Sequence, residues 1–168
     1  AVVHDTLSEG LSQSVDFDAV FDRVLLLIAE VASSHQTRVH PTFSGSFGEL
    51  PSAYATPLAL ALTELVTNAV EHGLAGRDGA VEIIANRTDD TLTVEVRDNG
   101  VGLAEGKVGT GLGTQIVRTL IQGELGGTID WHTIMGSGTE VTIEIPLTWL
   151  TKAQEAGNPS GRVPPKVV

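Results

Sequence analysis

The chain reads Asp98-Asn99-Gly100-Val101-Gly102, then Gly109-Thr110-Gly111-Leu112-Gly113, then Gly136-Ser137-Gly138-Thr139. Glycine is favoured where the backbone needs a positive φ or approaches a ligand closely, and inside regular structure it costs roughly 0.5–1 kcal/mol relative to alanine. Each cluster alone is also typical of an ordinary hairpin turn. Three clusters in this order, after a helical segment that carries Glu64 and Asn68, predict a nucleotide site.

Composition restricts the class of protein. The chain has 168 residues, enough for one domain with its own core. Its 10 Lys and Arg against 21 Asp and Glu give a formal charge of −11, which argues against a nucleic-acid or anionic-membrane surface and favours a metal ion beside any bound phosphate. Cysteine is absent, which excludes thiolate metal sites and fits a reducing compartment. No apolar stretch approaches the ~20 residues of a membrane span, so we expect a cytoplasmic protein.

The composition also divides the chain into three parts. Residues 1–15 begin without Met or a signal-peptide pattern, so we expect them to be the end of an upstream dimerisation or linker segment of a longer protein. Residues 16–148 show no repeat and no low-complexity block, which predicts one compact domain. Residues 149–168 are polar and proline-rich, which predicts a flexible tail.

Hydrophobic periodicity predicts three helices, over residues 16–34, 57–72 and 112–122. Asp16 is expected to cap the first helix, Pro57 to lie in the first turn of the second, and Gly73 to end it. The apolar stripe expected on the first helix consists of Phe17, Val20, Phe21, Val24, Leu25, Ile28 and Val31.

Five strands are predicted between and after these helices, over residues 38–43, 80–87, 91–97, 127–134 and 139–145. Pro41 places the first of them at an edge of the sheet or in an irregular position, because proline donates no ladder hydrogen bond. Residues 92–97 alternate between apolar and polar, which indicates one buried and one exposed face. The predicted order is therefore mixed α/β.

The second helix carries Glu64, Asn68, Glu71 and His72 on the side opposite its leucines. An amide oxygen is a good ligand for Mg²⁺, and a carboxylate one turn away can orient or deprotonate a reacting group. The alternative is the solvated polar face that most amphipathic helices have.

Two further features point to a nucleotide. Asp98 ends a strand before a glycine turn, where its carboxylate could accept a hydrogen bond from the exocyclic amine of adenine, although an Asp that bonds its own turn is equally common. Gly109 to Gly113 lead into a helix, an arrangement that binds phosphate. The P-loop and dinucleotide-binding patterns do not fit, and no histidine has metal-ligand spacing.

Together these segments resemble a known superfamily. Glu64-Leu-Val-Thr-Asn68-Ala, Asp98-Asn-Gly-Val-Gly102, Gly109-Thr-Gly-Leu-Gly113 and Gly136-Ser-Gly-Thr139 are similar to the N, G1, G2 and G3 boxes of the histidine-kinase, gyrase, Hsp90 and MutL ATPases. The run Gly-Leu-Gly-Thr-Gln-Ile-Val-Arg-Thr-Leu resembles that of a bacterial sensor histidine kinase, and more narrowly of the soluble actinobacterial type with a second-class dimerisation domain.

The resemblance implies an α+β fold, a two-layer α/β sandwich of the Bergerat type, with about five strands in a mixed sheet and three helices on one face. It implies ATP and Mg²⁺ as cofactors, Glu64 as the catalytic residue and Asn68 as the Mg²⁺ ligand. The ATP-binding residues that it implies are Asn68, His72, Asp98, Gly100, Gly102, Thr110, Gly111, Leu112, Gly113 and Thr139.

The sequence departs from the pattern of this superfamily in two respects. Glu71 stands where many relatives have a basic residue that contacts phosphate, and Lys107 or Arg118 is the candidate replacement. The phospho-accepting histidine is expected before Ala1, because His4 resembles a residue that follows the acceptor hairpin. We therefore expect this chain to bind ATP without phosphorylating itself.

The resulting hypothesis is the catalytic domain of a cytoplasmic sensor histidine kinase. Its expected partners are a response regulator and its own dimerisation and phosphoacceptor domain, which makes the full-length protein a homodimer. Two alternatives remain open: a serine/threonine kinase of the anti-sigma-factor type, and a non-catalytic nucleotide-sensing module.

Overall fold

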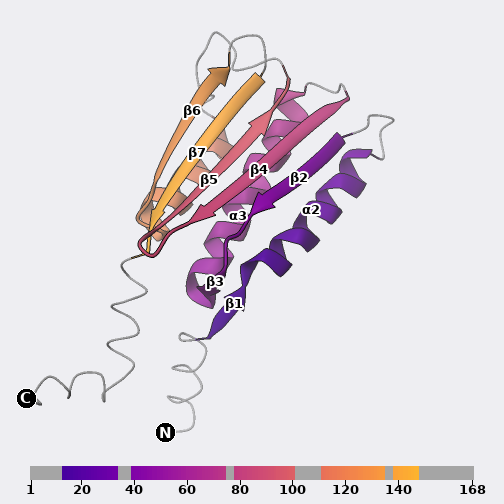
Figure 1. Cartoon of the computed structure of the whole chain (residues 1–168). Coiled ribbons are helices and arrows are strands. Elements are labelled where there is room, and N and C mark those ends of the chain that lie inside the picture. Colours follow the sequence, from indigo (N-terminus) through magenta and orange to yellow (C-terminus); the bar gives the residue numbers. More distant parts are fainter. Residues whose placement is uncertain (1–12, 34–38, 75–77, 101–110, 135–137, 148–168) are drawn as a thin grey trace, which may run out of the picture.

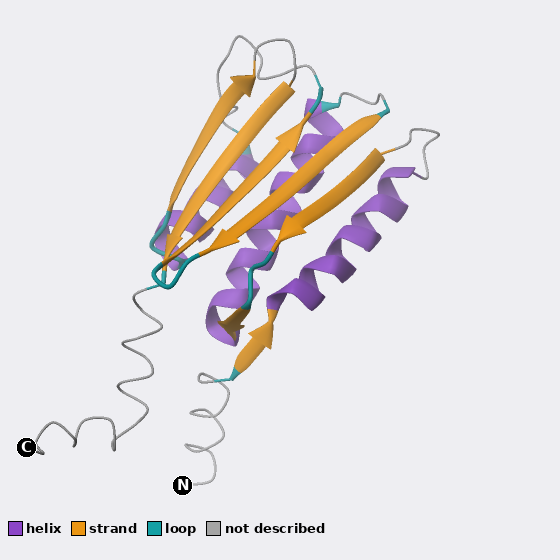
Figure 2. Ribbon diagram, in the orientation of Figure 1, coloured by secondary structure: helices purple, strands orange, loops and turns teal. Residues whose placement is uncertain are grey.

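The structure is a computed structural model of the chain, and it describes residues 13–33, 39–74, 78–100, 111–134 and 138–147. A five-stranded mixed sheet forms one layer, and the helices cover one of its faces (Figures 1 and 2). The strands lie in the order β2-β4-β5-β7-β6, with β2 parallel to β4 and the other pairs antiparallel. Their bounds are β2 Val39–Gly45, β4 Gly79–Arg87, β5 Thr91–Asp98, β6 Thr128–Ile134 and β7 Gly138–Pro146. The predicted two-layer α+β sandwich is confirmed.

The alternation of residues along each strand decides which face is buried. In β5, Leu92, Val94 and Val96 are buried beneath the helices, while the residues between them lie on the open face. Arg97 on that open face forms ion pairs with Glu82 of β4 and Glu140 of β7, on the two neighbouring strands. Pro41 lies in β2, an edge strand of the sheet, as predicted.

Helix α2, Phe17–Ser33, lies beside β2 at the edge of the helical layer (Figure 1). Asp16 caps it as predicted, because its carboxylate accepts a hydrogen bond from the Ala19 N–H at 3.4 Å. Phe17, Phe21 and Leu25 are buried. The expected stripe is wrong at its end, since Val31 is exposed. The buried residues follow one another at intervals of four, and position 31 is rotated away from that line.

Helix α3, Ser52–Asn68, continues into a π-helical turn, η1, Ala69–Gly73. The expected start at Pro57 is wrong, because the helix begins five residues earlier and Pro57 lies inside it. Pro57 cannot donate to the carbonyl of Ala53, but that residue is exposed near the helix start, where water can satisfy its carbonyl. The end at Gly73 is confirmed.

Helix α4, Leu112–Arg118, also continues into a π-helical segment, η3, Thr119–Glu124. The predicted start at Leu112 is confirmed. None of the helices in the described part of the chain is both long and apolar enough to span a bilayer.

Two short strands that the sequence did not predict, β1 Ser14–Asp16 and β3 Glu49–Pro51, pair with each other beside the start of α2. The loop between β2 and β3 is held by Asp18, which accepts hydrogen bonds from the Ser46 Oγ at 2.8 Å, the Phe47 N–H at 2.7 Å and the Gly48 N–H at 3.2 Å. These contacts fix the end of the sheet opposite Asp98.

Candidate nucleotide site

Asp98 lies at the end of β5 and is buried, with only 7% of its surface exposed. Its Oδ1 accepts hydrogen bonds from the backbone N–H of Gly100 at 3.0 Å and of Thr139 at 3.4 Å. The bond from the Gly100 N–H is the contact of an Asp with its own turn, which the sequence left open as the alternative to a ligand-binding role. Both of these hydrogen bonds engage Oδ1. The Oδ2 atom of an ionised carboxylate is a further hydrogen-bond acceptor.

Burial raises the pKa of the Asp98 carboxyl above its ordinary value of 3.8, because the charged form loses hydration. The two backbone hydrogen bonds oppose this rise, since they favour the charged form. Asp98 and Thr139 are the polar residues that are buried in the described part of the chain, and they face each other in the β5–β7 pairing. A buried, desolvated carboxylate of this kind is typical of a functional site.

Gly138 makes the approach of β7 to Asp98 possible. Its φ is +102°, a value that side chains rarely adopt, and a Cβ added there would lie 2.1 Å from the Asp98 carbonyl oxygen and 2.7 Å from its Oδ1. Only glycine therefore fits between the strand ends. The close approach of the two strands therefore explains why a glycine stands at position 138, in the third glycine cluster of the sequence.

Asn99 is a positioning residue that the sequence analysis missed. Its Oδ1 accepts a hydrogen bond from the Ala80 N–H at 2.9 Å, and its own N–H donates to the Ala80 carbonyl at 3.3 Å. Gly79 gives Asn99 room, since a Cβ at Gly79 would lie 2.7 Å from the Asn99 Oδ1. The signal in the sequence is the Asp-Asn-Gly run, which is typical of a turn and in which the Asn amide can bond to the backbone of a neighbouring strand.

The predicted catalytic and metal-binding side chains come from α3. Glu64 and Asn68 are half-buried and lie one turn apart, as the spacing predicted. Gly113 of α4 packs against Glu64, since a Cβ at Gly113 would lie 2.9 Å from the Glu64 Oε2. The structure thus brings the segment that carries Glu64 and the glycine segment that carries Gly113 together around one carboxylate.

The turn η1 connects the part of α3 that carries Glu64 and Asn68 to the end of the sheet that carries Asp98. Leu74 N–H donates to the Ala69 carbonyl at 2.9 Å, five residues back, and η1 contacts both β5 and β7. Asn68 precedes this turn directly and Glu71 within it is exposed. Asn68 therefore lies close along the chain to the turn that meets the strands of Asp98 and Thr139.

The remaining predicted residues fall into three groups. Gly111 and Leu112 are exposed at the start of α4, and Gly100 is half-buried. The guanidinium of Arg118 stacks over the Trp131 ring at 4.8 Å, a contact that was not foreseen for a candidate phosphate ligand. Gly102, Lys107 and Thr110 lie outside the described residues, as does the side chain of His72.

A comparison of the sequence with known protein families identifies the family of this chain. The profile of the histidine kinase-, DNA gyrase B-, and HSP90-like ATPases matches residues 53–148, which include Glu64, Asp98 and Thr139. The chain belongs to this family. ATP, the nucleotide expected from the sequence, is the ligand of a domain of this kind.

Curated relatives narrow the likeness to histidine kinases. The chain is 39% identical over 153 residues to the sensor histidine kinase PdtaS of Mycobacterium tuberculosis, which covers 88% of this chain and 30% of that protein. It is 36% identical over 106 residues to blue-light-activated histidine kinase 2 of Erythrobacter litoralis, covering 60% of this chain and 30% of that protein. The chain therefore spans less than a third of these relatives. The expected resemblance to actinobacterial sensor kinases is confirmed.

Solved structures give the same fold. The histidine kinase domain of the Erythrobacter litoralis EL346 blue-light-activated kinase matches with a TM-score of 0.73 and 26% identity, covering 83% of this chain and 64% of that chain. The histidine kinase ThkA, solved in complex with the response regulator protein TrrA, matches with a TM-score of 0.64 and 22% identity, covering 80% of this chain and 41% of that chain. The second likeness supports the fold alone.

Proposed function

We propose that this chain is the ATP-binding catalytic domain of a two-component sensor histidine kinase. In this role it transfers the γ-phosphoryl group of ATP to a histidine on a dimerisation domain that precedes it, and a response regulator then receives the group. The likeness to PdtaS over 88% of the chain supports this proposal. The pairing of Asp98 with Thr139 and the packing of Gly113 against Glu64 support it as well. In this role the domain lies in the cytoplasm, because it needs access to ATP and to a response regulator.

Asp98 recognises the adenine base in this proposal. Its desolvated carboxylate accepts a hydrogen bond from the exocyclic amine of adenine, where guanine presents a carbonyl oxygen that a carboxylate repels. Gly138 lets β7 approach this carboxylate closely, and the Thr139 N–H keeps the carboxylate in place. Because the hydrogen bond is charge-assisted and shielded from water, it is among the stronger polar contacts that a site offers.

Asn68 and Glu64 offer an amide oxygen and a carboxylate from adjacent turns of α3, and hard oxygen donors of this kind suit Mg²⁺. We propose Asn68 as the residue that holds the ion, which neutralises phosphate charge when bound. The assignment also fits the net charge of −11, because the chain supplies few cations of its own for a triphosphate.

Glu64 positions the accepting group. Its carboxylate can accept a hydrogen bond from the far N–H of a neutral imidazole, which keeps the other ring nitrogen free to attack phosphorus. Gly113 holds α4 against this carboxylate and limits its rotamers. The catalytic work is therefore positioning and charge neutralisation, as in other phosphoryl transfers.

The experiment that tests this function uses the longer protein that contains this chain. With ATP labelled at the γ-phosphate, we expect label on a histidine, which is labile in acid and stable in alkali. The Glu64→Gln variant should bind ATP as the wild type does and lose roughly 10²-fold or more of the transfer rate. The neutral amide is a weaker hydrogen-bond acceptor than the carboxylate, and it does not stabilise the positive charge that develops on the imidazole. The matched control is Glu144→Gln, on the open face of the sheet.

Two outcomes would contradict the proposal. Transfer that survives in Glu64→Gln at the wild-type rate would remove Glu64 from the mechanism. Alkali-labile label on a serine of a small protein, made by the 168-residue chain alone, would instead favour a serine kinase of the anti-sigma-factor type.

A further inference from the structure

The side of α2 that faces away from the sheet carries apolar residues where a surface helix normally carries polar ones. Leu26 is 67% exposed, Leu27 is 62% exposed and Val31 is 70% exposed. These are three of the six large apolar side chains that are exposed in the described part of the chain. Single exposed leucines need no explanation, but three within two turns of one helix form a patch. The opposite side of α2 already packs on the core, so this patch is a second apolar face.

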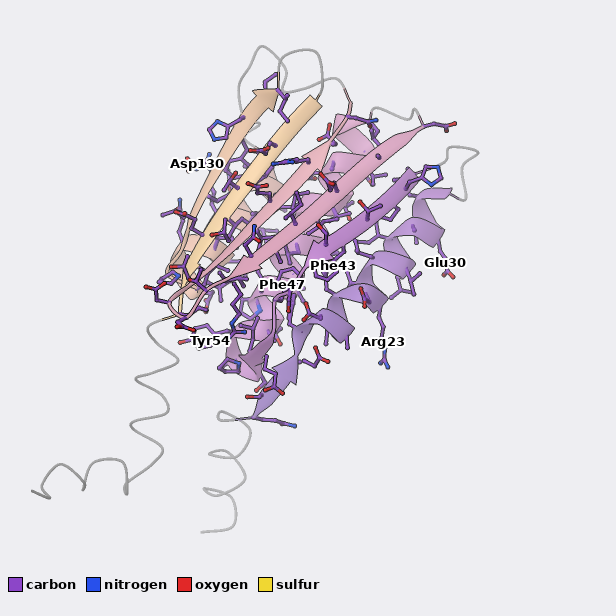
Figure 3. The ribbon with its side chains drawn as sticks, viewed as in Figure 1. Arg23, Glu30, Phe43, Phe47, Tyr54 and Asp130 are labelled. Atoms are coloured by element: carbon purple, nitrogen blue, oxygen red, sulfur yellow. The ribbon has the colours of Figure 1, made fainter. Side chains whose placement is uncertain are left out.

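Two charged residues bracket this patch on the same stripe. Arg23 and Glu30 are seven residues apart, which is two helical turns or about 10 Å along the axis. At about 100° per residue, Arg23 and Glu30 lie within about 20° of each other around the helix, and Leu26 and Leu27 flank them at about 50° on either side. Figure 3 shows the side chains of Arg23 and Glu30 extending from the side of α2 that points away from the sheet. Both residues are exposed.

The order of these residues is complementary to itself. A two-fold axis placed between Leu26 and Leu27 sets Arg23 of one copy opposite Glu30 of the other, and brings the leucines of the two copies together around the axis. The same rotation forms each ion pair twice, which is the property of the isologous contacts that cyclic dimers use. A parallel arrangement would instead place Arg23 against Arg23. The charges therefore favour one orientation, with the two helices antiparallel.

We propose that the outer stripe of α2 (Arg23, Leu26, Leu27 and Glu30) docks against the same stripe of a second copy of this chain. One helix per subunit buries less than the roughly 1,200 Å² of a stable interface, so the contact is weak alone and strengthens where another interface already holds two copies together. The stripe contains none of the candidate nucleotide-site residues. The dimer therefore leaves that site open, and its existence does not depend on the function proposed above.

The test is sedimentation velocity on the 168-residue chain over a wide range of protein concentration, without nucleotide. The wild type should shift from monomer to dimer as its concentration rises. Arg23→Glu and Glu30→Arg should each raise the dissociation constant by about tenfold, because each reversal turns two attractive pairs into two repulsive ones. The double variant Arg23→Glu/Glu30→Arg should restore the wild-type dissociation constant. Leu27→Gln should weaken the dimer without rescue by either charge change.

Net charge separates this mechanism from general repulsion. Glu30→Arg reduces the net negative charge of −11 and would strengthen association if only overall repulsion mattered, whereas the proposed pairs require that it weakens. Glu144→Arg makes the same charge change on the open face of the sheet, and Ile116→Gln removes an exposed apolar side chain from α4. Neither control should weaken the dimer. Circular-dichroism melting of each variant reports whether the fold is retained.

Two results would overturn the proposal. One is a double variant that stays as weak as the single reversals. The other is a wild-type chain that remains monomeric at every concentration. If α2 then became protected from hydrogen exchange only in the longer protein, the stripe would belong to another segment of that protein and not to a second copy.

Discussion

At the scale of single residues, Asp98 combines two conditions that usually exclude each other. It is buried, which disfavours its charge, yet the adenine contact proposed above requires its charged form at neutral pH. The N–H groups of Gly100 and Thr139 offset part of the cost and fix the direction of the side chain. Because the folded state holds the carboxyl proton more tightly than the unfolded chain, stability and nucleotide selectivity are opposed at this residue.

Asp98→Asn tests this opposition. A raised pKa in the folded state stabilises the fold fully below the ordinary value of 3.8, and this contribution is lost as the pH rises through the folded pKa. The free energy of unfolding of the wild type should therefore fall with pH across that window relative to the variant, as measured by urea denaturation. At neutral pH the variant should lose about tenfold or more of the preference for ATP over GTP in calorimetry. Asp130→Asn on the open face is the control, and equal pH profiles for the two variants would refute the role of burial.

At the scale of elements, the ends of β5 and β7 form the site, and one glycine allows them to meet. Gly138→Ala should lower the free energy of unfolding by about 3 kcal/mol or more. The added Cβ would clash with the Asp98 carbonyl oxygen, and the positive φ is unfavourable for alanine. Gly126→Ala is the matched control, since Gly126 has a φ of +64° with no atom near its Cβ position, and it should cost only about 1–2 kcal/mol. Urea denaturation measures both losses. Equal losses would show that backbone strain alone, and not the approach of the two strands, makes Gly138 necessary.

The elements also show which parts of a fold a sequence can predict. The strands β4 to β7 were predicted to within about one residue, because alternation directly reflects a sheet with one buried face. The start of α3 was missed, since Pro57 resembled a helix start while the tertiary contacts of Ala55 and Leu58 extend the helix past it. The strands β1 and β3 have three residues each and depend on a long-range pairing that leaves no periodic signal. At the site, Asp98 and Thr139 followed from the glycine boxes, whereas Asn99 acts through backbone atoms of Ala80 that no local pattern identifies.

At the scale of the whole molecule, the two ends of the sheet have different tasks. The end that carries Asp98 holds the candidate site, and the other end is held by packing and hydrogen bonds. There Phe17, Phe21, Phe43 and Phe47 form a cluster of ring contacts between α2 and the β2–β3 region, and Figure 3 shows Phe43 and Phe47 close together beneath the sheet. Arg87 donates hydrogen bonds from its Nη1 to the carbonyls of Phe47 and Glu49. We therefore expect that one end can be altered without disturbing the other.

Asp18→Ala tests the separation. The change leaves the Phe47 N–H, on a fully buried residue, and the Gly48 N–H without the carboxylate that accepts their hydrogen bonds, so the free energy of unfolding should fall by about 1–3 kcal/mol. Asp22→Ala, one turn further along α2 and exposed, should cost less than about 0.5 kcal/mol and serves as the control. Calorimetry should give the same ATP affinity for both variants and the wild type wherever the protein is folded, because Asp18 and Asp98 lie at opposite ends of the sheet. A marked loss of ATP affinity in folded Asp18→Ala would show that the two ends are coupled, and that the sheet transmits changes from the α2 region to the nucleotide site.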